Sequence, residues 1–395
     1  MKKLIALLLA VVLLLSLAAC SSAGGQKEAD KVHKIGVIVY NLGDEEVIGF
    51  REYLQGYIEK NFEMVKFLYS DSIRSAEQEM AFIQDACDQG AEGFLSFLSY
   101  DLAAEVALCE QNKAYYLLAS GTVDDADFDA VADNPWFLGM FGPGIELEYK
   151  AGIDMARFFV SQHGGDRYFI LSGGASVGNE MHYQRALGML YGLCSEYGAS
   201  FGQPLETLAG TDKALTLSDK GLTVTICPGY MSNDESRAAA VELYTGDTYD
   251  YVLATLSIGE FYSSVGSAQL GMVDSYNTRN LQLFTNGTLH YLVGKYFSSV
   301  GPSVMLMLNA LAGYGKDFRE DGKAIRVNQS FWVSDSLTDY VDKYALSQSA
   351  SMIAYNFDDL SQVCRLFNSE ATLARLSALA RANSYDDVLL RRRSG

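Results

Sequence analysis

Several predicted β-strands end in side chains that can hydrogen-bond to a small polar molecule or pack against it. In an open parallel sheet, ligands bind beyond the carboxyl ends of the strands, where side chains from several loops converge. Carboxylates, amides and hydroxyls hydrogen-bond to ligand hydroxyl groups, and aromatic faces cover C–H surfaces, a combination that suits a sugar. The strand ends nominate eight residues for such contacts: Tyr40, Asp44, Glu45, Tyr100, Ser120, Tyr183, Ser257 and Asn286.

Simpler roles compete with ligand binding for the acidic and aromatic members of this set. Asp44-Glu45-Glu46 precedes a predicted helix, where carboxylates are stabilised by the positive end of the helix dipole, and the sequence favours neither role. The chain has 25 Tyr residues, so each nominated Tyr is more often a packing residue than a ligand contact. The run of three acids also favours a cationic ligand, which stays open beside a sugar.

No group of residues in the sequence assembles a catalytic or metal site. The four His residues are scattered and none has the spacing of metal ligands. The run Gly173–Gly178 resembles a phosphate-binding loop, but no Gly-Lys-Ser/Thr follows and the dinucleotide spacing fails. No Gly-x-Ser-x-Gly turn occurs with His and acid partners in support. The sequence therefore predicts a protein that is not an enzyme and needs no cofactor or metal.

Short apolar runs alternate with longer amphipathic segments from Lys34 onward, the pattern of βαβ units and a parallel sheet. The rhythm restarts after Gly142-Pro143-Gly144, and a body of roughly 360 residues is too long for one ordinary core. We therefore expect the α/β class, with two doubly wound parallel-sheet lobes. Among the later elements we expect a helix over Gly259–Leu270, a strand over Leu281–Thr285 and a long amphipathic helix within Leu360–Ala382.

The first residues predict export from the cytoplasm. Two Lys residues precede the apolar run Leu4–Leu17, which is shorter than the roughly 20 residues of a membrane-spanning helix. Leu17-Ala18-Ala19-Cys20 resembles the lipobox of bacterial lipoproteins, which implies a lipid on Cys20, the alternative being an ordinary secretory peptide. We expect a signal peptide over 1–19 and a flexible tether over 20–32. The expected location is the extracytoplasmic face of the cell membrane, through the lipid anchor only.

Charge and cysteine content exclude further classes of partner. Without the signal peptide, 28 basic residues remain against 49 acidic ones, a net charge of −21. Such a surface repels nucleic acids and anionic lipid headgroups, so no nucleic-acid partner is expected. With Cys20 lipidated, five Cys residues remain at unrelated spacings, which predicts neither a disulfide framework nor a zinc site.

Three local patterns carry a resemblance to a known family. Tyr149–Gly152 opens a helix directly after the predicted start of the second lobe, and Gln184–Met189 places Arg185 three residues before Gly188. Phe284–Gly287, Gly294–Lys295 and Val300–Pro302 follow in order. Over roughly Lys34 to Ser334, this succession resembles the type I periplasmic solute-binding proteins of ABC transporters, whose fold is LacI-like.

The resemblance implies a two-lobed clamp with three crossings, near Phe141–Gly144, Val300–Pro302 and Val327–Ser334. It assigns 33–141 plus 301–328 to an N-terminal lobe, and 142–300 plus 329–395, with a C-terminal helical extension, to a C-terminal lobe. It implies a monomeric, lipid-anchored binding component of an ABC importer, which passes a small polar ligand, first of all a sugar, to a membrane permease. A lipoprotein that presents its ligand-closed form to a membrane sensor is the alternative.

The chain departs from sugar-binding members of this family at two strand ends. Those members have Asp-Arg after the fourth strand, where this chain has Ser120-Gly121. They have Asp after the strand that is expected here to end at Thr285, where this chain has Asn286. Because the Arg that clamps the sugar is absent, a nucleoside, a polyol or a cationic compound stays open as the ligand.

Overall fold

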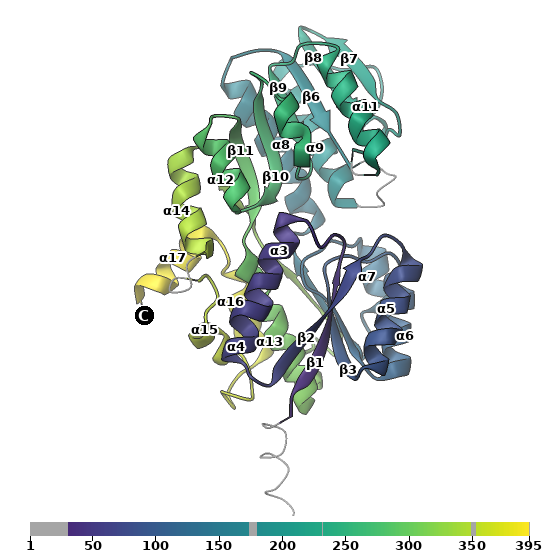
Figure 1. Ribbon diagram of the computed structural model, residues 1–395, viewed down its shortest axis with the longest axis vertical. Coiled ribbons are helices and arrows are strands. Elements are labelled where there is room, and N and C mark those ends of the chain that lie inside the picture. Colours follow the sequence, from purple (N-terminus) through teal and green to yellow (C-terminus); the bar gives the residue numbers. More distant parts are fainter. Residues whose placement is uncertain (1–30, 174–179, 231, 349–352, 395) are drawn as a thin grey trace, which may run out of the picture.

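The computed structural model describes residues 31–173, 180–230, 232–348 and 353–394, which form two α/β lobes stacked end to end (Figure 1). The predicted signal peptide, Cys20 and all but the last two residues of the predicted tether lie outside the described residues. Within the described ranges, no helix has both the length and the apolar character needed to cross a membrane.

The N-terminal lobe is built on a six-stranded parallel sheet with the strand order β12-β5-β4-β3-β1-β2. Its first strand carries Ile35, Val37, Ile38 and Val39, which are almost fully buried. The strands are β1 (His33–Val39), β2 (Val65–Ser72), β3 (Ala91–Ser96), β4 (Tyr115–Leu118), β5 (Phe137–Gly142) and β12 (Ile325–Asn328). The helices are α3 (Glu45–Arg51), the π-helix η1 (Glu52–Ile58), α4 (Glu59–Asn61), α5 (Ala76–Asp88), α6 (Leu102–Asn112), α7 (Asp125–Val131), α13 (Gly301–Asn309), the π-helix η5 (Ala310–Tyr314) and the 3-10 helix η6 (Gly315–Phe318).

The C-terminal lobe is built on a seven-stranded sheet with the order β13-β11-β10-β9-β6-β8-β7, parallel except at its two edge strands. Its strands are β6 (Arg167–Leu171), β7 (Leu215–Asp219), β8 (Leu222–Cys227), β9 (Tyr251–Ala254), β10 (Gln269–Ser275), β11 (Leu289–Lys295) and β13 (Trp332–Ser334). Its helices are α8 (Ile145–Ser161), α9 (Glu180–Tyr197), α10 (Leu205–Ala209), α11 (Asp234–Thr245), the 3-10 helix η3 (Gly259–Ser264) and α12 (Thr278–Thr285). The predicted fold class, two lobes with mostly parallel sheets, is confirmed.

The chain passes between the lobes three times. It leaves β5 for α8, leaves β11 for α13 through the 3-10 helix η4 (Phe297–Val300), and leaves β12 for β13. Gly152 of the Tyr149–Gly152 pattern and Gly188 of the Gln184–Met189 pattern have a packing role, because α8 and α9 lie backbone to backbone. A Cβ atom on Gly152 would lie 2.1 Å from the carbonyl oxygen of Arg185, and one on Gly188 would lie 2.1 Å from that of Tyr149.

Two expected elements of the C-terminal lobe are wrong. The segment expected as a helix over Gly259–Leu270 is a short 3-10 helix, after which Gly266 turns the chain with a φ of 64° and β10 begins. The segment expected as a strand over Leu281–Thr285 belongs to helix α12, because the Asn277 side chain caps it by accepting a hydrogen bond from the Asn280 amide at 2.8 Å.

The expected long helix within Leu360–Ala382 is also wrong, because the chain forms two short helices there, α15 (Phe357–Ser361) and α16 (Leu373–Arg381). Thr372 starts the second helix, since its hydroxyl accepts a hydrogen bond from the Arg375 amide at 3.3 Å. Two further helices, α14 (Leu337–Gln348) and α17 (Tyr385–Ser394), complete this C-terminal segment.

The C-terminal segment runs along one side of the molecule and contacts both lobes (Figure 1). On the C-terminal lobe, the Tyr340 hydroxyl donates to the Asn277 carbonyl at 2.8 Å. On the N-terminal lobe, the Tyr53 hydroxyl donates to the Tyr355 carbonyl at 2.9 Å. The segment that the sequence assigned to the C-terminal lobe therefore packs against both lobes.

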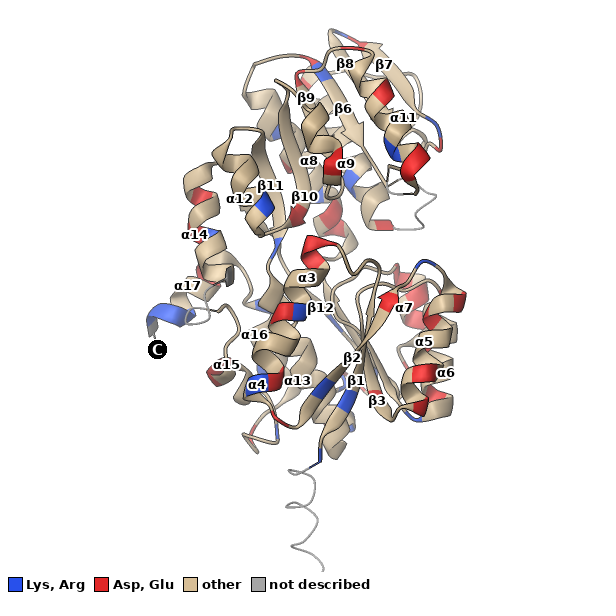
Figure 2. Cartoon of the chain, in the orientation of Figure 1, with Lys and Arg blue, Asp and Glu red and all other residues tan. Residues whose placement is uncertain are grey.

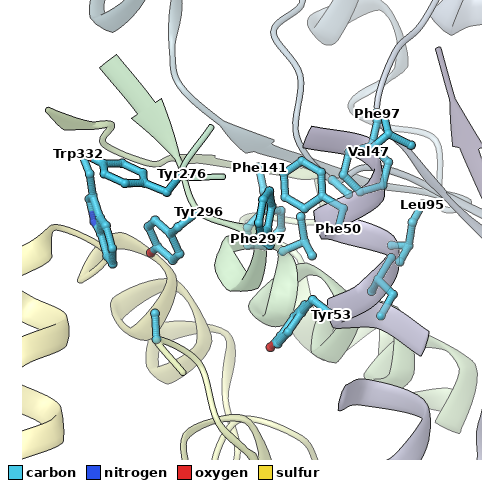
Figure 3. Close-up of a cluster of buried hydrophobic side chains, with 14 of the residues drawn as sticks. Val47, Phe50, Tyr53, Leu95, Phe97, Phe141, Tyr276, Tyr296, Phe297 and Trp332 are labelled. Atoms are coloured by element: carbon cyan, nitrogen blue, oxygen red, sulfur yellow. The ribbon is translucent and has the colours of Figure 1, made fainter. Parts of the chain in front are cut away.

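A buried aromatic cluster joins this segment to the crossings (Figure 3). Trp332 stacks on Tyr296 with ring centroids 4.0 Å apart, and both side chains are about 1% exposed. The Trp332 indole N–H and the Tyr296 hydroxyl both donate to the Asn383 carbonyl, at 2.8 and 3.0 Å. The Asn383 side chain in turn bonds to the amide and the carbonyl of Ser330, at 3.0 and 2.9 Å. The last helices are thereby fixed to the strand that returns between the lobes.

We predict that Asn383→Ala lowers the free energy of unfolding by about 1–2 kcal/mol, because it removes both side-chain hydrogen bonds to Ser330. Urea unfolding measures the loss. Arg381→Ala, which changes an exposed residue near the end of α16, is the control and should cost less than about 0.5 kcal/mol. Equal effects of the two substitutions would contradict a supporting role for Asn383.

Candidate functional site

A cavity of about 690 Å³ lies between the lobes, at the facing carboxyl ends of the two sheets. This volume is in the range of small-molecule sites. The N-terminal lobe contributes mainly the residues that follow β1, β3 and β4. The C-terminal lobe contributes the start of α9, the residues after β9, and the carboxyl ends of β10 and β11. The side chains on which the site is built are Tyr40, Asp44, Glu46, Phe97, Tyr100, Ser120, His182, Tyr183, Arg185, Ser257, Asp274 and Lys295.

Six of the eight nominated residues line this cavity, and their role as ligand contacts stays a prediction. They are Tyr40, Asp44, Tyr100, Ser120, Tyr183 and Ser257. Glu45 and Asn286 do not line it. Glu45 is exposed on the first turn of α3, and its neighbour Glu46 lines the cavity instead.

Asn286 lies outside the cavity because the strand assigned before it is a helix. It is exposed at the end of α12, where its side chain accepts a hydrogen bond from the Thr288 amide at 3.0 Å. The strand that reaches the cavity is β10, and Asp274 stands near its carboxyl end. An acidic residue is therefore present near this strand end, whereas the segment assigned as a strand before Asn286 is a helix. The sequence signal was Leu270–Val273, an apolar run directly before an Asp.

Asp44 serves the helix and faces the cavity at the same time. Its carboxylate caps α3 by accepting the Glu46 amide at 2.9 Å, and it accepts the Tyr40 hydroxyl at 3.1 Å. Burial, followed by repulsion from Glu46, raises the pKa of Asp44 to about 6. The role at a helix N-terminus that the sequence suggested for the acidic run therefore holds for Asp44, which also lines the cavity.

Asp274 is the most deeply buried carboxyl group in the wall of the cavity, being 6% exposed. It accepts a hydrogen bond from the Asn280 side-chain amide at 2.8 Å. Burial, followed by repulsion from Asp44, raises the pKa of Asp274 to about 7.

Lys295, at the end of β11, brings a positive charge to the same place. Its ammonium lies 3.3 Å from the Glu46 carboxylate, in an ion pair that links the two lobes, and these side chains are only 12% and 15% exposed. The Gly294–Lys295 step of the sequence thereby places a cation in the cavity wall.

Arg185, which the sequence singled out on its helix, is committed to the protein itself. Its guanidinium pairs with Glu148, with 3.0 Å between one nitrogen and one oxygen, and donates to the Thr255 carbonyl at 2.6 Å. His182 lines the cavity beside it, with Nδ1 3.2 Å from the Thr255 hydroxyl. Burial, followed by repulsion from Arg185, lowers the pKa of His182 to about 3, so the imidazole is neutral at pH 7.

A pair of buried carboxyl groups holds the loop that carries Tyr100. Glu79 and Glu105 are both fully buried. Glu105 accepts the amides of Tyr100 and Asp101 at 3.0 and 2.8 Å, and the Ser99 hydroxyl at 2.7 Å. Burial and repulsion from Glu105 raise the pKa of Glu79 to about 9, so Glu79 carries a proton at pH 7. The loop at one side of the cavity is thus fixed by hydrogen bonds to the buried Glu105.

Asp274 should make the folded state less stable as the pH rises. Its pKa is about 7 in the folded protein against 3.8 for the free group, so the folded state binds more protons between these values. We predict that Asp274→Asn gains stability relative to the wild type between pH 5 and pH 8, by about 1 kcal/mol or more. Urea unfolding across this range measures the difference. Asn286→Ala is the control. If the difference in unfolding free energy between Asp274→Asn and the wild type did not change with pH, the raised pKa of Asp274 would be contradicted.

The two buried glutamates should respond differently to amide substitution. Glu79→Gln resembles the protonated acid and should cost less than about 1 kcal/mol. Glu105→Gln keeps one oxygen for the Tyr100 and Asp101 amides, but its NH2 group replaces the oxygen that accepts from the Ser99 and Tyr116 hydroxyls, and it should cost about 2 kcal/mol. Denaturant unfolding at pH 7 compares them. A larger loss of stability for Glu79→Gln than for Glu105→Gln would contradict the assignment of the proton to Glu79.

In the described part of the chain, no three His, Cys, Asp or Glu residues come together in a way that could hold a metal ion. Cys87, Cys109, Cys194, Cys227 and Cys364 are free thiols, all of them buried except the partly exposed Cys87. The groups that line the cavity include hydrogen-bonding, charged and aromatic side chains.

No protein-family model matches the chain, and no curated protein matches its sequence. Its fold is similar to solved structures at low identity. An ABC transporter solute-binding protein from Bacillus halodurans C-125 with bound myo-inositol is 15% identical, with a TM-score of 0.57 over 80% of this chain and 98% of that one. An arabinose-transporter binding protein from Shewanella sp. ANA-3 is 12% identical, with a TM-score of 0.56 over 80% and 95%.

A different class of protein shares this fold. The transcription regulator CcpA of Lactococcus lactis is 12% identical, with a TM-score of 0.52 over 78% of this chain and all of that one. These likenesses settle the architecture around the cavity. The chain has the fold of the type I periplasmic binding proteins, as the sequence resemblance implied.

Proposed function

We propose that this protein captures a small polar solute, a sugar or polyol, as the binding component of an ABC importer. The observation that carries the proposal is the cavity of about 690 Å³ between two lobes, lined from both sides by polar and aromatic side chains. Structural neighbours with bound myo-inositol, arabinofuranose and D-allose support a solute of this class. In this proposal the cavity binds its solute without transforming it, as expected from structural neighbours that are binding proteins.

Closure of the lobes on the solute follows from where the contacts lie. A ligand favours the closed form only if it binds that form more tightly, which requires contacts from both lobes. Tyr40 and Asp44 face it from one lobe, and Tyr183 and Asp274 from the other. The three crossings allow a hinge motion between rigid sheets. In this proposal the closed form docks on a membrane permease, while the lipid on Cys20 keeps the monomer at the extracytoplasmic face.

A sensing role is the second candidate. The presence of a transcription regulator among the structural neighbours means that this architecture serves signalling as well as transport. A lipoprotein of this shape could present its closed form to a membrane sensor without passing on the solute. Uptake of a bound, radiolabelled solute by cells, and loss of uptake on deletion of this gene, would separate transport from sensing.

We predict that the melting temperature of the full-length protein rises with one or more sugars or polyols in a thermal-shift screen that also contains nucleosides, amino acids and polyamines. A ligand at 100 times its dissociation constant adds about 2.7 kcal/mol of stability. The rise should vanish in Tyr183→Ala, which changes a cavity residue, and persist in Asn286→Ala, which changes an exposed residue outside it. No rise with any sugar or polyol, or a rise that survives Tyr183→Ala, would count against the proposal.

A further inference from the structure

The inner wall of the cavity holds more negative charge than the protein balances. Asp44, Glu46, Asp274 and Lys295 meet there, from both lobes. The Lys295 ammonium is paired with Glu46 at 3.3 Å. Hydrogen bonds to the other two carboxylates come from neutral donors. These include the Tyr40 hydroxyl and Glu46 amide for Asp44, and the Asn280 side-chain amide and Ser275 hydroxyl for Asp274.

The nearby arginines do not supply the missing charge. Arg185 lines the cavity but is paired with the fully buried Glu148. Arg279 lies over the Tyr262 ring at 4.9 Å, is exposed, and does not line the cavity. Figure 2 shows acidic positions at the start of α3 in one lobe and at the end of β10 in the other. Three more acids, Asp124, Asp127 and Glu180, also line the cavity.

A second observation in the same cavity points to a polar ligand. Ser120 is 7% exposed and lines the cavity, and its hydroxyl has no hydrogen-bond partner in the described part of the chain. Ser120 also lines a small recess that continues past Lys295 toward Asn383, so it lies on the same side as the charged group. The Ser120 oxygen is not among the fully enclosed polar atoms of the described residues, so a solute in the cavity can reach it.

Closure over the solute makes the charge imbalance costly. Ionised carboxylates that lose their water without gaining a counter-charge lose several kcal/mol of solvation each. A neutral solute can donate hydroxyl hydrogen bonds to Asp44 and Asp274 but brings no counter-charge, so the cost of closure over it is relieved only by proton uptake on these acids. A cation between them is attracted by both, and the rings of Tyr40, Tyr100 and Tyr183 can cover the remainder of the solute.

Resting on the proposed function, we infer that the solute is a polyhydroxylated amine, such as an amino sugar, whose ammonium group binds between Asp44 and Asp274 while its hydroxyls meet Ser120 and the tyrosines. This inference narrows the solute class without changing the role of the protein. It also gives Ser120-Gly121 a meaning, because an Arg at this wall would repel the ammonium group.

Calorimetric titration of the full-length protein with matched probes tests the inference. The probes are glucose, galactose, mannose and myo-inositol, the aminodeoxy form of each, the N-acetylated form of each amine, and spermidine as a cation without hydroxyls. We expect at least one amine to bind tenfold or more tightly than both its parent and its N-acetylated form. This preference should fall below twofold in Asp274→Asn and in Asp44→Asn, and remain in the control Asn286→Ala.

The other outcomes separate the inference from the proposed function. If a neutral or N-acetylated sugar binds as tightly as the amine, the binding function stands and the charged solute is wrong. If the preference for the amine survives both Asp→Asn substitutions, the assigned position of the ammonium is wrong. If spermidine alone binds, the hydroxyl-bearing solute is wrong, and if no probe binds, the proposed function falls together with the inference.

Proton exchange on binding gives an independent readout at pH 6. Tyr40, Glu46, Lys295 and Tyr262 also surround the two acids, whose pKa values are about 6 for Asp44 and about 7 for Asp274. An ammonium group lowers both pKa values, so binding should release protons, as titrations in two buffers of different ionisation enthalpy would show. Proton uptake with the amine would overturn the inference.

Discussion

The parallel direction of the strands in both lobes determines where this protein can bind anything. All the strands of one sheet, and all but the edge strands of the other, run parallel, and the carboxyl ends of the two sheets face each other. The loops after β1, β3, β4 and β9 and the carboxyl ends of β10 and β11, which are far apart in the sequence, therefore converge on one cavity. The three crossings join the two sheets beside it.

The charges of Asp44 and Asp274 at this convergence lower the stability of the folded state. As we infer, the same charges favour the binding of a cationic solute. Asp44 and Asp274 are held in the wall by neutral donors, and their raised pKa values reflect the burial of two like charges. The fold tolerates the electrostatic cost of these two buried acids because the rest of it is well packed. Here the support comes from the aromatic cluster of Tyr296 and Trp332 (Figure 3) and from the C-terminal segment that contacts both lobes.

Sequence reasoning recovered the architecture because its signals are local and repeated. Buried strands such as β1 are short β-branched runs, and the capped helix that starts after Asp44 follows directly, so Tyr40 and Asp44 were placed correctly at a strand end. It failed over 259–285, where a 3-10 helix, a strand and a capped helix follow one another at short intervals. In that stretch apolar spacing alone does not distinguish strand from helix, so Asp274 was missed and Asn286 was nominated in its place. The ion pair between Lys295 and Glu46 joins residues 249 positions apart and depends on how the lobes meet, which no local pattern shows.

A crystal structure of the protein with the tightest-binding solute tests the central claim most directly. The account predicts the solute between the lobes, in contact with Tyr40 or Asp44 on one side and with Tyr183 or Asp274 on the other. A solute that contacts one lobe only, or that lies outside this cavity, would contradict it.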